Sequence, residues 1–402
     1  MRRLIILGDG IADEALPQWG GKTPLAQAKT PNLDTLARKG KCGTLQTIPY
    51  GMPAGSEVAN MAILGYDVRQ HCIGRGALEA VDLKLSLEAE DIVLRCNLVS
   101  IIDGILVDHM GGGISTAEAH TLLQDLGIYL HSSVFTFGKG ERYRHLLRGK
   151  GFAVQIVCTP PHEALNLPVE HISVRATQAE GTQTAQQLND LMATAHAFLS
   201  AHPLNKQRQA NGLLPANGIA LWGIGTTPQI PLLSTLYPAL KRTAMITATA
   251  VMKGIAHYAG MDLLPVDGAT GLWDTNYEAK AQAAIDALEN YDLVYLHIEA
   301  ADEASHIGNA ALKKQIIEDI DARLLSPVIE AIEANKEMTR LAFLPDHATP
   351  CALKHHTAVP VPFLVYERGI MADTVQMYTE ESVLEGSLKG LAGREFMDMF
   401  VR

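Results

Sequence analysis

The sequence lacks long apolar runs, cysteine pairs at metal-binding spacing and any excess of basic residues. No run of about 18 apolar residues occurs among the 402, so we expect no membrane-spanning segment. Acidic residues outnumber basic ones by 44 to 33, and the net charge of -11 argues against a nucleic acid or an anionic membrane surface as the main partner. Any anionic substrate therefore needs a local basic pocket.

Cysteine is scarce, and its spacing excludes two classes of protein. The five cysteines are odd in number and form no CxxC pair, which argues against a disulfide framework and a structural zinc site. They are Cys42, Cys72, Cys96, Cys158 and Cys351. The apolar run at residues 4–7 is too short for the core of a signal peptide and is followed by Asp9. We therefore expect reduced thiols and a cytoplasmic protein.

The order of the expected elements predicts an α/β protein with an inserted domain. Internal repeats and low-complexity tracts are absent, and 402 residues suffice for two domains. Residues 1–91 and 238–402 alternate buried strands with helices, which is typical of a mostly parallel sheet flanked by helices. Residues 92–237 mix short strands with fewer helices, and we interpret them as a smaller α+β domain inserted into the first.

Individual elements follow from hydrophobic periodicity and capping signals. We expect strands at 3–7, 43–48, 92–101, 105–109, 134–137, 152–157, 244–250, 293–298, 341–344 and 361–366. We expect helices at 30–40, 56–65, 182–199, 278–289 and 310–335, and one that begins at a capping box, Ser115 to Glu118. Thr30 is the expected N-cap of the first helix, Pro327 is expected to kink the last, and residues 205–217 are expected to form an exposed loop.

Ser56 stands where a broken loop meets a helix. Gly51, Pro53 and Gly55 interrupt regular structure before it, and a helical pattern begins at Ser56. The hydroxyl is therefore expected beside unpaired backbone N–H groups at the positive end of a helix, which is a natural seat for phosphate. A serine at a helix start is usually a cap, so this stretch alone favours a cap over a nucleophile.

Carboxylate and imidazole side chains recur at the ends of the expected strands. They are Asp9, Asp302, His306, Asp346 and His347, each after a strand, and His356 before the last one. Strand ends of a parallel sheet meet at one edge, so these groups can converge there with Ser56. Such ligands without cysteine suit Mn²⁺, Zn²⁺ or Mg²⁺. Seven groups suit two ions about 3.5–4 Å apart, an arrangement used in phosphoryl transfer. Each pair alone is as well explained by solvated surface groups.

Motifs along nearly the whole chain resemble those of one family and follow its order. They are Gly8-Asp9-Gly10, Lys22-Thr23-Pro24-Leu25, residues 30–34, Gly55-Ser56, Gly74-Arg75-Gly76, Thr159-Pro160-Pro161-His162, residues 268–271, residues 275–277, residues 302–306, Asp346-His347 and His356-Thr357. With these motifs the chain resembles the cofactor-independent phosphoglycerate mutases of the shorter, archaeal-type branch. The resemblance implies an alkaline-phosphatase-like fold and no need for 2,3-bisphosphoglycerate.

The resemblance also assigns roles. It implies that Ser56 is the nucleophile that becomes phosphoserine. One metal ion would be held by Asp302, His306 and His356, and the other by Asp9, Ser56, Asp346 and His347. The carboxylate and phosphate of a small phosphorylated substrate would be held by basic groups, for which the candidates are Arg75, Lys253, His162, Arg95 and Arg144. An insert that closes as a lid would keep water from hydrolysing the intermediate.

One position departs from the family pattern. Gly113 stands where members often carry arginine or histidine, and a subgroup proposed to phosphorylate homoserine is compatible with the stretch 297–304. Phosphoglycerate mutase is thus the main hypothesis. A phosphotransferase that acts on another small alcohol such as homoserine, and a phosphatase that uses water, stay open. A non-catalytic scaffold is disfavoured because it would need no nucleophile. The sequence does not indicate the oligomeric state.

Overall fold

The computed structural model describes residues 1–71, 73–335 and 337–402, so Cys72 lies outside the described residues. The chain divides into two compact units, unit 1 (Met1–Cys72 and Ile230–Arg402) and unit 2 (Ile73–Gln229). The expected insert and unit 2 share residues 92–229. Unit 2 begins earlier than the expected insert because helix α5 (Arg75–Asp82) packs on strands β3 (Asp91–Ile102) and β9 (Gly218–Thr226). Glycines at 74 and 76 permit this close approach, since a Cβ at Gly74 would lie 1.9 Å from the Ile224 carbonyl oxygen.

Unit 1 is built on an eight-stranded sheet in the order β11-β10-β12-β1-β13-β14-β2-β15. Its strands are β1 (Arg2–Gly8), β2 (Lys41–Gln46), β10 (Thr243–Ile246), β11 (Asp262–Leu263), β12 (Leu293–Ile298), β13 (Thr339–Leu344), β14 (Val361–Tyr366) and β15 (Leu388–Ala392). Strand β1 pairs in parallel with β12 and β13, whereas β14 runs antiparallel to β13 and β2. The expected mostly parallel sheet is confirmed.

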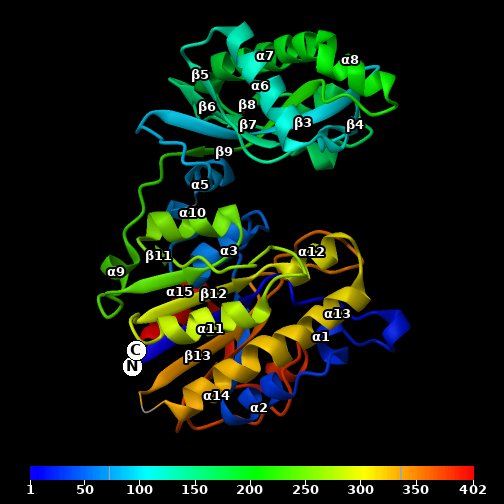
Figure 1. Cartoon of the computed structure of the whole chain (residues 1–402). Coiled ribbons are helices and arrows are strands. Elements are labelled where there is room, and N and C mark those ends of the chain that lie inside the picture. Colours follow the sequence, from blue (N-terminus) through cyan, green and yellow to red (C-terminus); the bar gives the residue numbers. More distant parts are fainter. Residues whose placement is uncertain (72, 336) are drawn as a thin grey trace. The chain divides into compact units, whose positions relative to one another are not determined.

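Helices cover both faces of this sheet (Figure 1). They are α1 (Pro24–Gln27), α2 (Pro31–Lys39), α3 (Ser56–Ile63), α4 (Val68–His71), α9 (Leu233–Leu236), α10 (Ala250–Ala259), α11 (Tyr277–Ala287), α12 (Ala300–His306), α13 (Ala310–Asp319), α14 (Ser326–Ala334) and α15 (Gly393–Val401). One face packs against α2, α11, α13 and α14 in a continuous apolar core. Helices α3, α10 and α15 pack together on the other face. None of the helices in the described part of the chain is long and apolar enough to cross a membrane.

Three expectations for unit 1 are met only in part. Thr30 occupies the expected N-cap position but makes no capping bond; instead the Asp321 carboxylate accepts bonds from the backbone N–H groups of Leu33 (2.8 Å) and Asn32 (3.2 Å). The helix expected over 310–335 is interrupted by a π-helical segment, Ile320–Leu325, just before Pro327. The wider turn accommodates a residue that has no N–H to donate. The strand expected over 244–250 ends at Ile246, and helix α10 begins at Ala250.

Unit 2 combines an antiparallel sheet with four helices. The helices are α5, α6 (Thr116–Leu130), α7 (Thr182–Ala201) and α8 (Pro203–Ala210). The strands are β3 (Asp91–Ile102), β4 (Ile105–Asp108), β5 (Phe135–Gly138), β6 (Arg144–Lys150), β7 (Ile156–Val157), β8 (Arg175–Ala176) and β9 (Gly218–Thr226). The long strand β3 pairs with β4, β6 and β9, and β7 and β8 form a separate pair. The inserted α+β segment of the expected fold class is confirmed.

Local expectations for unit 2 have mixed outcomes. The capping box at Ser115 and Glu118 is confirmed, since each side chain bonds the other residue's backbone N–H. The exposed loop expected over 205–217 is wrong, because Asn205 and Arg208 lie buried on α8. Arg208 donates to the carbonyl oxygens of Leu214 and Gly112. These two polar residues thus make hydrogen bonds within the protein and do not face solvent. The strand expected over 152–157 shrinks to β7.

Candidate functional site

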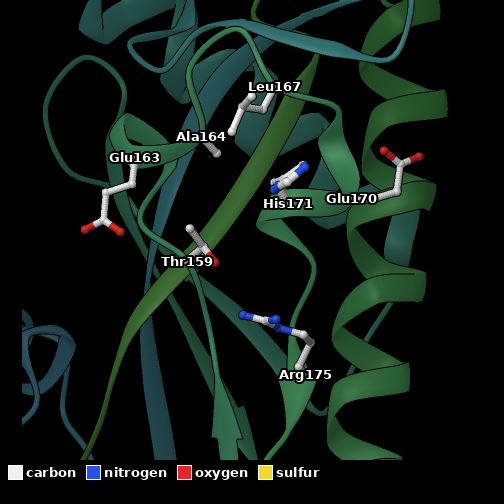
Figure 2. Close-up of a pocket in the computed structure, with 7 residues that line it drawn as sticks. All are labelled: Thr159, Glu163, Ala164, Leu167, Glu170, His171 and Arg175. Atoms are coloured by element: carbon white, nitrogen blue, oxygen red, sulfur yellow. The ribbon is translucent and has the colours of Figure 1, made fainter.

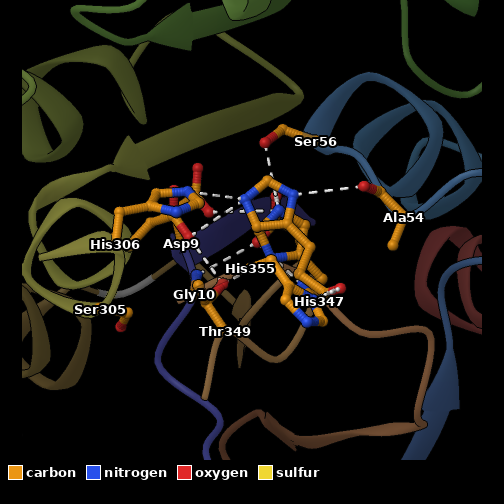
Figure 3. A network of polar contacts seen from close by, with 12 residues as sticks. Asp9, Gly10, Ala54, Ser56, Ser305, His306, His347, Thr349 and His355 are labelled. Atoms are coloured by element: carbon orange, nitrogen blue, oxygen red, sulfur yellow. Dashed lines mark hydrogen bonds and ion pairs between the residues drawn. The ribbon is translucent and has the colours of Figure 1, made fainter. Parts of the chain in front are cut away.

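The carboxyl edge of the unit 1 sheet gathers the carboxylates and imidazoles. Asp9 follows β1, Asp302 and His306 lie on α12 directly after β12, and Asp346 and His347 follow β13. Strand β14 is antiparallel, so its first residues lie at this same edge and bring His356 there. Ser56 is the first residue of α3 and follows the loop after β2 (Figure 3). All seven residues expected to hold metal are therefore brought together.

One cluster consists of Asp302, His306 and His356. Nε2 of His306 lies 3.0 Å from Asp302 Oδ2, Nε2 of His356 lies 3.4 Å from Asp302 Oδ1, and the two Nε2 atoms are 3.0 Å apart. Nδ1 of each ring faces a backbone carbonyl, that of Lys354 for His306 and that of Ala54 for His356. A carbonyl only accepts, so Nδ1 of each ring carries a proton, and in the neutral ring Nε2 is the nitrogen left with a lone pair. Two such nitrogens 3.0 Å apart beside a carboxylate can bind a shared cation in place of protons.

A second cluster contains Asp9, Ser56, Asp346 and His347. Nε2 of His347 lies 3.2 Å from Ser56 Oγ, 3.4 Å from Asp346 Oδ2 and 3.7 Å from Asp9 Oδ1. The hydroxyl of Thr349 donates to Asp302 at 2.6 Å, so it accepts from His347 Nδ1 at 3.1 Å. Nε2 of His347 therefore also presents a lone pair. Oδ1 of Asp9 is buried and has no hydrogen-bond partner among the described residues.

The charges of the two clusters are out of balance without a cation. Burial and the neighbouring Asp346 carboxylate raise the pKa of Asp9 well above its ordinary value. The hydrogen bond to Asp302 raises the pKa of His306 to about 9, whereas burial lowers the pKa of His347. A nearby cation favours the ionised carboxylate and the neutral imidazole. Oxygen and nitrogen donors without sulfur suit hard and borderline divalent ions, so the residues present fit divalent metals.

The structure corrects the interpretation of Ser56 as a cap. Ser56 is the first residue of α3, and Gly55 occupies the N-cap position without a side-chain bond. The hydroxyl instead faces His347. Sequence reasoning missed Asn60, Tyr295 and His297, which contact the carboxylates of the second cluster directly or through one another. Tyr295 and His297 alternate within an otherwise apolar strand, and that period of two was the available signal.

Four of the five expected substrate-binding residues lie in unit 2, where three of them surround Trp222. The Arg95 guanidinium lies 4.1 Å and that of Arg75 6.0 Å from the Trp222 ring centroid, and the His162 ring lies 5.5 Å from it. Glu79 pairs with both arginines, at 2.9 Å for Arg95 and 3.2 Å for Arg75. Burial lowers the pKa of Arg95 to about 10, so the group stays charged at neutral pH.

The same assembly continues through further aromatic residues. The fourth expected residue, Arg144, lies over the Tyr143 ring at 5.7 Å, and His109 contacts both Tyr143 and His162. Sequence reasoning missed His109, Tyr143 and the partners of Arg95, Trp222 and Glu79. Trp222 is the β9 residue paired with Arg95 of β3, a register that no sequence motif reveals. The fifth expected residue, Lys253, lies on α10 in unit 1.

Unit 2 also contains a pocket of about 370 Å³ that sequence reasoning did not anticipate (Figure 2). Its lining residues are Thr159, Glu163, Ala164, Leu167, Glu170, His171 and Arg175. None of them belongs to the expected site. Two glutamates oppose one arginine and one histidine, so the lining has no net positive charge with which to hold a phosphate.

The chain is similar to known proteins over its whole length. Residues 1–402 match the metalloenzyme superfamily. The chain is 40% identical over 404 residues to a 2,3-bisphosphoglycerate-independent phosphoglycerate mutase of Methanosarcina barkeri, with 100% of both chains covered. It is 39% identical to a probable enzyme of the same name from Geobacter sulfurreducens, again with 100% of both chains covered.

Solved structures show the same likeness. The PH0037 protein from Pyrococcus horikoshii has a TM-score of 0.82 at 29% identity, with 99% of this chain and 96% of that chain covered. A cofactor-independent phosphoglycerate mutase from Thermoplasma acidophilum has a TM-score of 0.66 at 29% identity, with 100% and 99% covered. Similarity to these proteins therefore extends over both units of the chain.

Proposed function

Because this chain belongs to the metalloenzyme superfamily and to the 2,3-bisphosphoglycerate-independent phosphoglycerate mutases, we propose that it interconverts 3-phosphoglycerate and 2-phosphoglycerate through a phosphoserine at Ser56. Such an enzyme is an isomerase of glycolysis and needs no 2,3-bisphosphoglycerate. The position of the Ser56 hydroxyl carries the proposal: it lies 3.2 Å from Nε2 of His347, which in turn faces the carboxylates of Asp9 and Asp346. A serine that merely capped α3 would face the helix.

The site is proposed to hold two divalent ions, of Mn²⁺, Zn²⁺ or Mg²⁺. Asp302, His306 and His356 would hold one, and Asp9, Ser56, Asp346 and His347 the other. When bound, such ions lower the pKa of the serine hydroxyl and stabilise the charge that develops on the phosphoryl oxygens. The support is that Nδ1 of each of the three histidines bonds an oxygen outside its cluster, which leaves Nε2 to face the cluster.

The reaction balances as two displacements at phosphorus. Ser56 Oγ attacks the phosphoryl group of 3-phosphoglycerate, so that a bond from serine oxygen to phosphorus forms while the bond to the glycerate oxygen breaks. The departing oxygen takes up the proton that Ser56 lost. Glycerate then turns, its 2-hydroxyl attacks the phosphoserine, and Ser56 regains a proton. Ser56 begins α3, so first-turn N–H groups without intrahelical acceptors are available to the phosphoryl oxygens.

The substrate anion needs positive charge that the acidic chain as a whole does not provide. The residues proposed to supply it are Arg75, Arg95, Arg144, His162 and Lys253. Glu79 and the face of Trp222 fix Arg95, so little side-chain entropy is lost when it binds an anion. Unit 2 as a lid that excludes water remains a prediction, which small-angle scattering with and without a substrate analogue would test. The proposed location is cytoplasmic, supported by the unpaired cysteines 42, 96, 158 and 351.

Glycine at 113 has a structural explanation that does not require a different acceptor. Its φ of +72° lies in the left-handed region, as do those of Gly111 and Gly112. Arg208 binds the Gly112 carbonyl oxygen and holds this turn. Any side chain at 113 would add strain, so the backbone accounts for the departure from the family pattern.

A substrate panel with Mn²⁺ tests the proposal. The protein should convert 3-phosphoglycerate to 2-phosphoglycerate, followed by coupling to enolase, and should show little transfer from ATP to homoserine and little hydrolysis of p-nitrophenyl phosphate. Faster phosphorylation of homoserine than mutase turnover would replace the proposed function with a kinase. Hydrolysis as the dominant activity would indicate a phosphatase.

A further inference from the structure

Two polar side chains on strand β12 bond the carboxylates of the second cluster, directly or through Asn60. This cluster, Asp9, Ser56, Asp346 and His347, is called the Ser56 cluster below. Tyr295 and His297 are two residues apart and therefore project from the same face of β12. Both are fully buried, with exposed fractions of 0% and 1%. That face is occupied by α3, because the Tyr295 hydroxyl bonds Asn60 of that helix. Strand β12 thus has the apolar core on its other face and α3, the helix that begins at Ser56, on this one.

His297 holds Asp9 directly. Its Nε2 lies 3.0 Å from Asp9 Oδ2, and its Nδ1 lies 3.2 Å from the Thr247 hydroxyl. The Thr247 hydroxyl can donate to Nδ1, which leaves the N–H at Nε2 to donate to the Asp9 carboxylate oxygen. With Oδ2 bound in this way, the unpartnered Oδ1 of Asp9 faces His347.

Tyr295 holds Asp346 through one intermediate residue. Its hydroxyl donates to Asn60 Oδ1 at 2.6 Å, and Asn60 Nδ2 donates to Asp346 Oδ2 at 2.9 Å and to the Ser56 carbonyl oxygen at 2.9 Å. The amide orientation is fixed because both the carboxylate and the carbonyl can only accept. Asn60 therefore ties the backbone of Ser56 to Asp346, and Tyr295 prevents the amide from turning.

We propose that Tyr295 and His297 are positioning residues that set the cation affinity of the Ser56 cluster. They have no effect on the cation affinity of the Asp302 cluster, which consists of Asp302, His306 and His356. Each of the two carboxylates of the Ser56 cluster has one oxygen bonded by one of them, Asp9 directly and Asp346 through Asn60. The other oxygen of Asp346 accepts from the backbone N–H groups of His347 and Gly10. The carboxylate of the other cluster, Asp302, is oriented from elsewhere, by the Thr349 hydroxyl at 2.6 Å. Partners that orient metal-binding carboxylates typically contribute 10–100-fold to metal affinity.

The proposal rests on the metal-holding role proposed for the two clusters and on no feature of the substrate. Its test is calorimetric titration of the full-length, metal-depleted chain with Mn²⁺ alone. Two variants remove the bonds, Tyr295→Phe and His297→Leu, and His297→Gln restores an N–H near the position of Nε2. Tyr378→Phe is the matched control, because Tyr378 is equally buried and its hydroxyl, among the described residues, bonds only the backbone carbonyl oxygens of Phe343 and Pro362.

We expect Tyr295→Phe and His297→Leu to bind Mn²⁺ about 10–100-fold more weakly at one class of site and within about 3-fold of wild type at the other. His297→Gln should recover part of the loss, and Tyr378→Phe should match the wild type. Repeating the titration in a His306→Ala background, which impairs the Asp302 cluster, identifies the affected site as the Ser56 cluster.

Three results would overturn the proposal. Unchanged affinity in both variants would make the contacts merely structural, and equal weakening of both site classes would indicate general disruption. A third Mn²⁺ in the wild type that His297→Leu loses would make His297 a ligand, a role for which Asp9, His297 and Glu299 are close enough. Because no substrate is present, none of these results bears on whether the enzyme is a mutase.

Discussion

Replacing Gly10 with alanine should disable the Asp302 cluster and leave the chain folded. Gly10 has a φ of +63°, and a Cβ there would lie 2.6 Å from Asp302 Oδ1 and 2.7 Å from Asp302 Cα. Because the Asp302 Cα atom belongs to the backbone of α12, the helix itself must move away from residue 10. Ordinary contact begins at 3.4 Å, which requires a shift of roughly 0.7 Å. Metal–ligand distances vary by only about 0.2 Å from their ideal values, and a misplacement of about 1 Å in an active site lowers the reaction rate about 100-fold.

Gly20→Ala is the matched control. Gly20 has a φ of +64°, and a Cβ added there would have no atom within 4 Å, so alanine adds only the cost of a left-handed backbone, about 1–2 kcal/mol. The unfolding free energy of Gly10→Ala should fall by the same amount and by about 1–3 kcal/mol more, because the added methyl group overpacks the site. The difference between the two variants isolates the contact with Asp302.

Urea unfolding and Mn²⁺ calorimetry measure both quantities. Gly10→Ala should bind Mn²⁺ at least about 10-fold more weakly at one class of site, whereas Gly20→Ala should bind it as the wild type does. Equal stability losses in the two variants, or wild-type Mn²⁺ binding by Gly10→Ala, would refute the steric reasoning.

Three further predictions concern burial, pH and metal. Lys313 is fully buried and pairs with Asp13 at 2.8 Å. Lys313→Met should therefore lower the unfolding free energy by about 3–5 kcal/mol, and adding Asp13→Asn should recover part of that loss. Unchanged stability of Lys313→Met in urea would contradict the importance of the pair. Burial lowers the pKa of His145 to about 4, below its unfolded value of about 6.5, so the unfolded chain binds more protons between these values. The stability that neutral His145 contributes is therefore complete above about pH 6.5 and is lost as the pH falls toward 4; His145→Gln should flatten that slope in a pH series of urea unfolding, and an unchanged slope rules the residue out. Chelation should abolish turnover and Mn²⁺ should restore it, whereas full activity in metal-depleted protein, checked by elemental analysis, would remove metals from the mechanism.

The sequence determines the strands of unit 1 better than those of unit 2, for a physical reason. Strands β12 and β14 are buried on both faces and read as short apolar runs, so the expected bounds of 293–298 and 361–366 match those observed. Strand β6 carries arginine and lysine at its ends and owes its place to pairing with β3. Its sequence alone gives no strand pattern.

The candidate site divides in the same way. Carboxylates and imidazoles at strand ends are visible in the sequence, because residue type and position state their chemistry. The bond from Asn60 to Asp346 joins residues 286 positions apart, and that from His297 to Asp9 joins residues 288 apart. The presence of His356 at this edge depends on β14 being antiparallel. Such placements follow from the sheet order and leave no local pattern.

The phosphorylation of Ser56 is the most direct test of the proposed mechanism. The enzyme with Mn²⁺ is mixed with 3-phosphoglycerate, quenched in acid within milliseconds to seconds, digested and examined by mass spectrometry. We predict phosphate on the peptide that contains Ser56. We also predict that Ser56→Ala loses turnover by several orders of magnitude while its unfolding free energy changes by no more than about 0.5 kcal/mol, since Ser56 caps no helix. A folded Ser56→Ala enzyme that turns over near the wild-type rate, or phosphate found only on another residue, would contradict the mechanism.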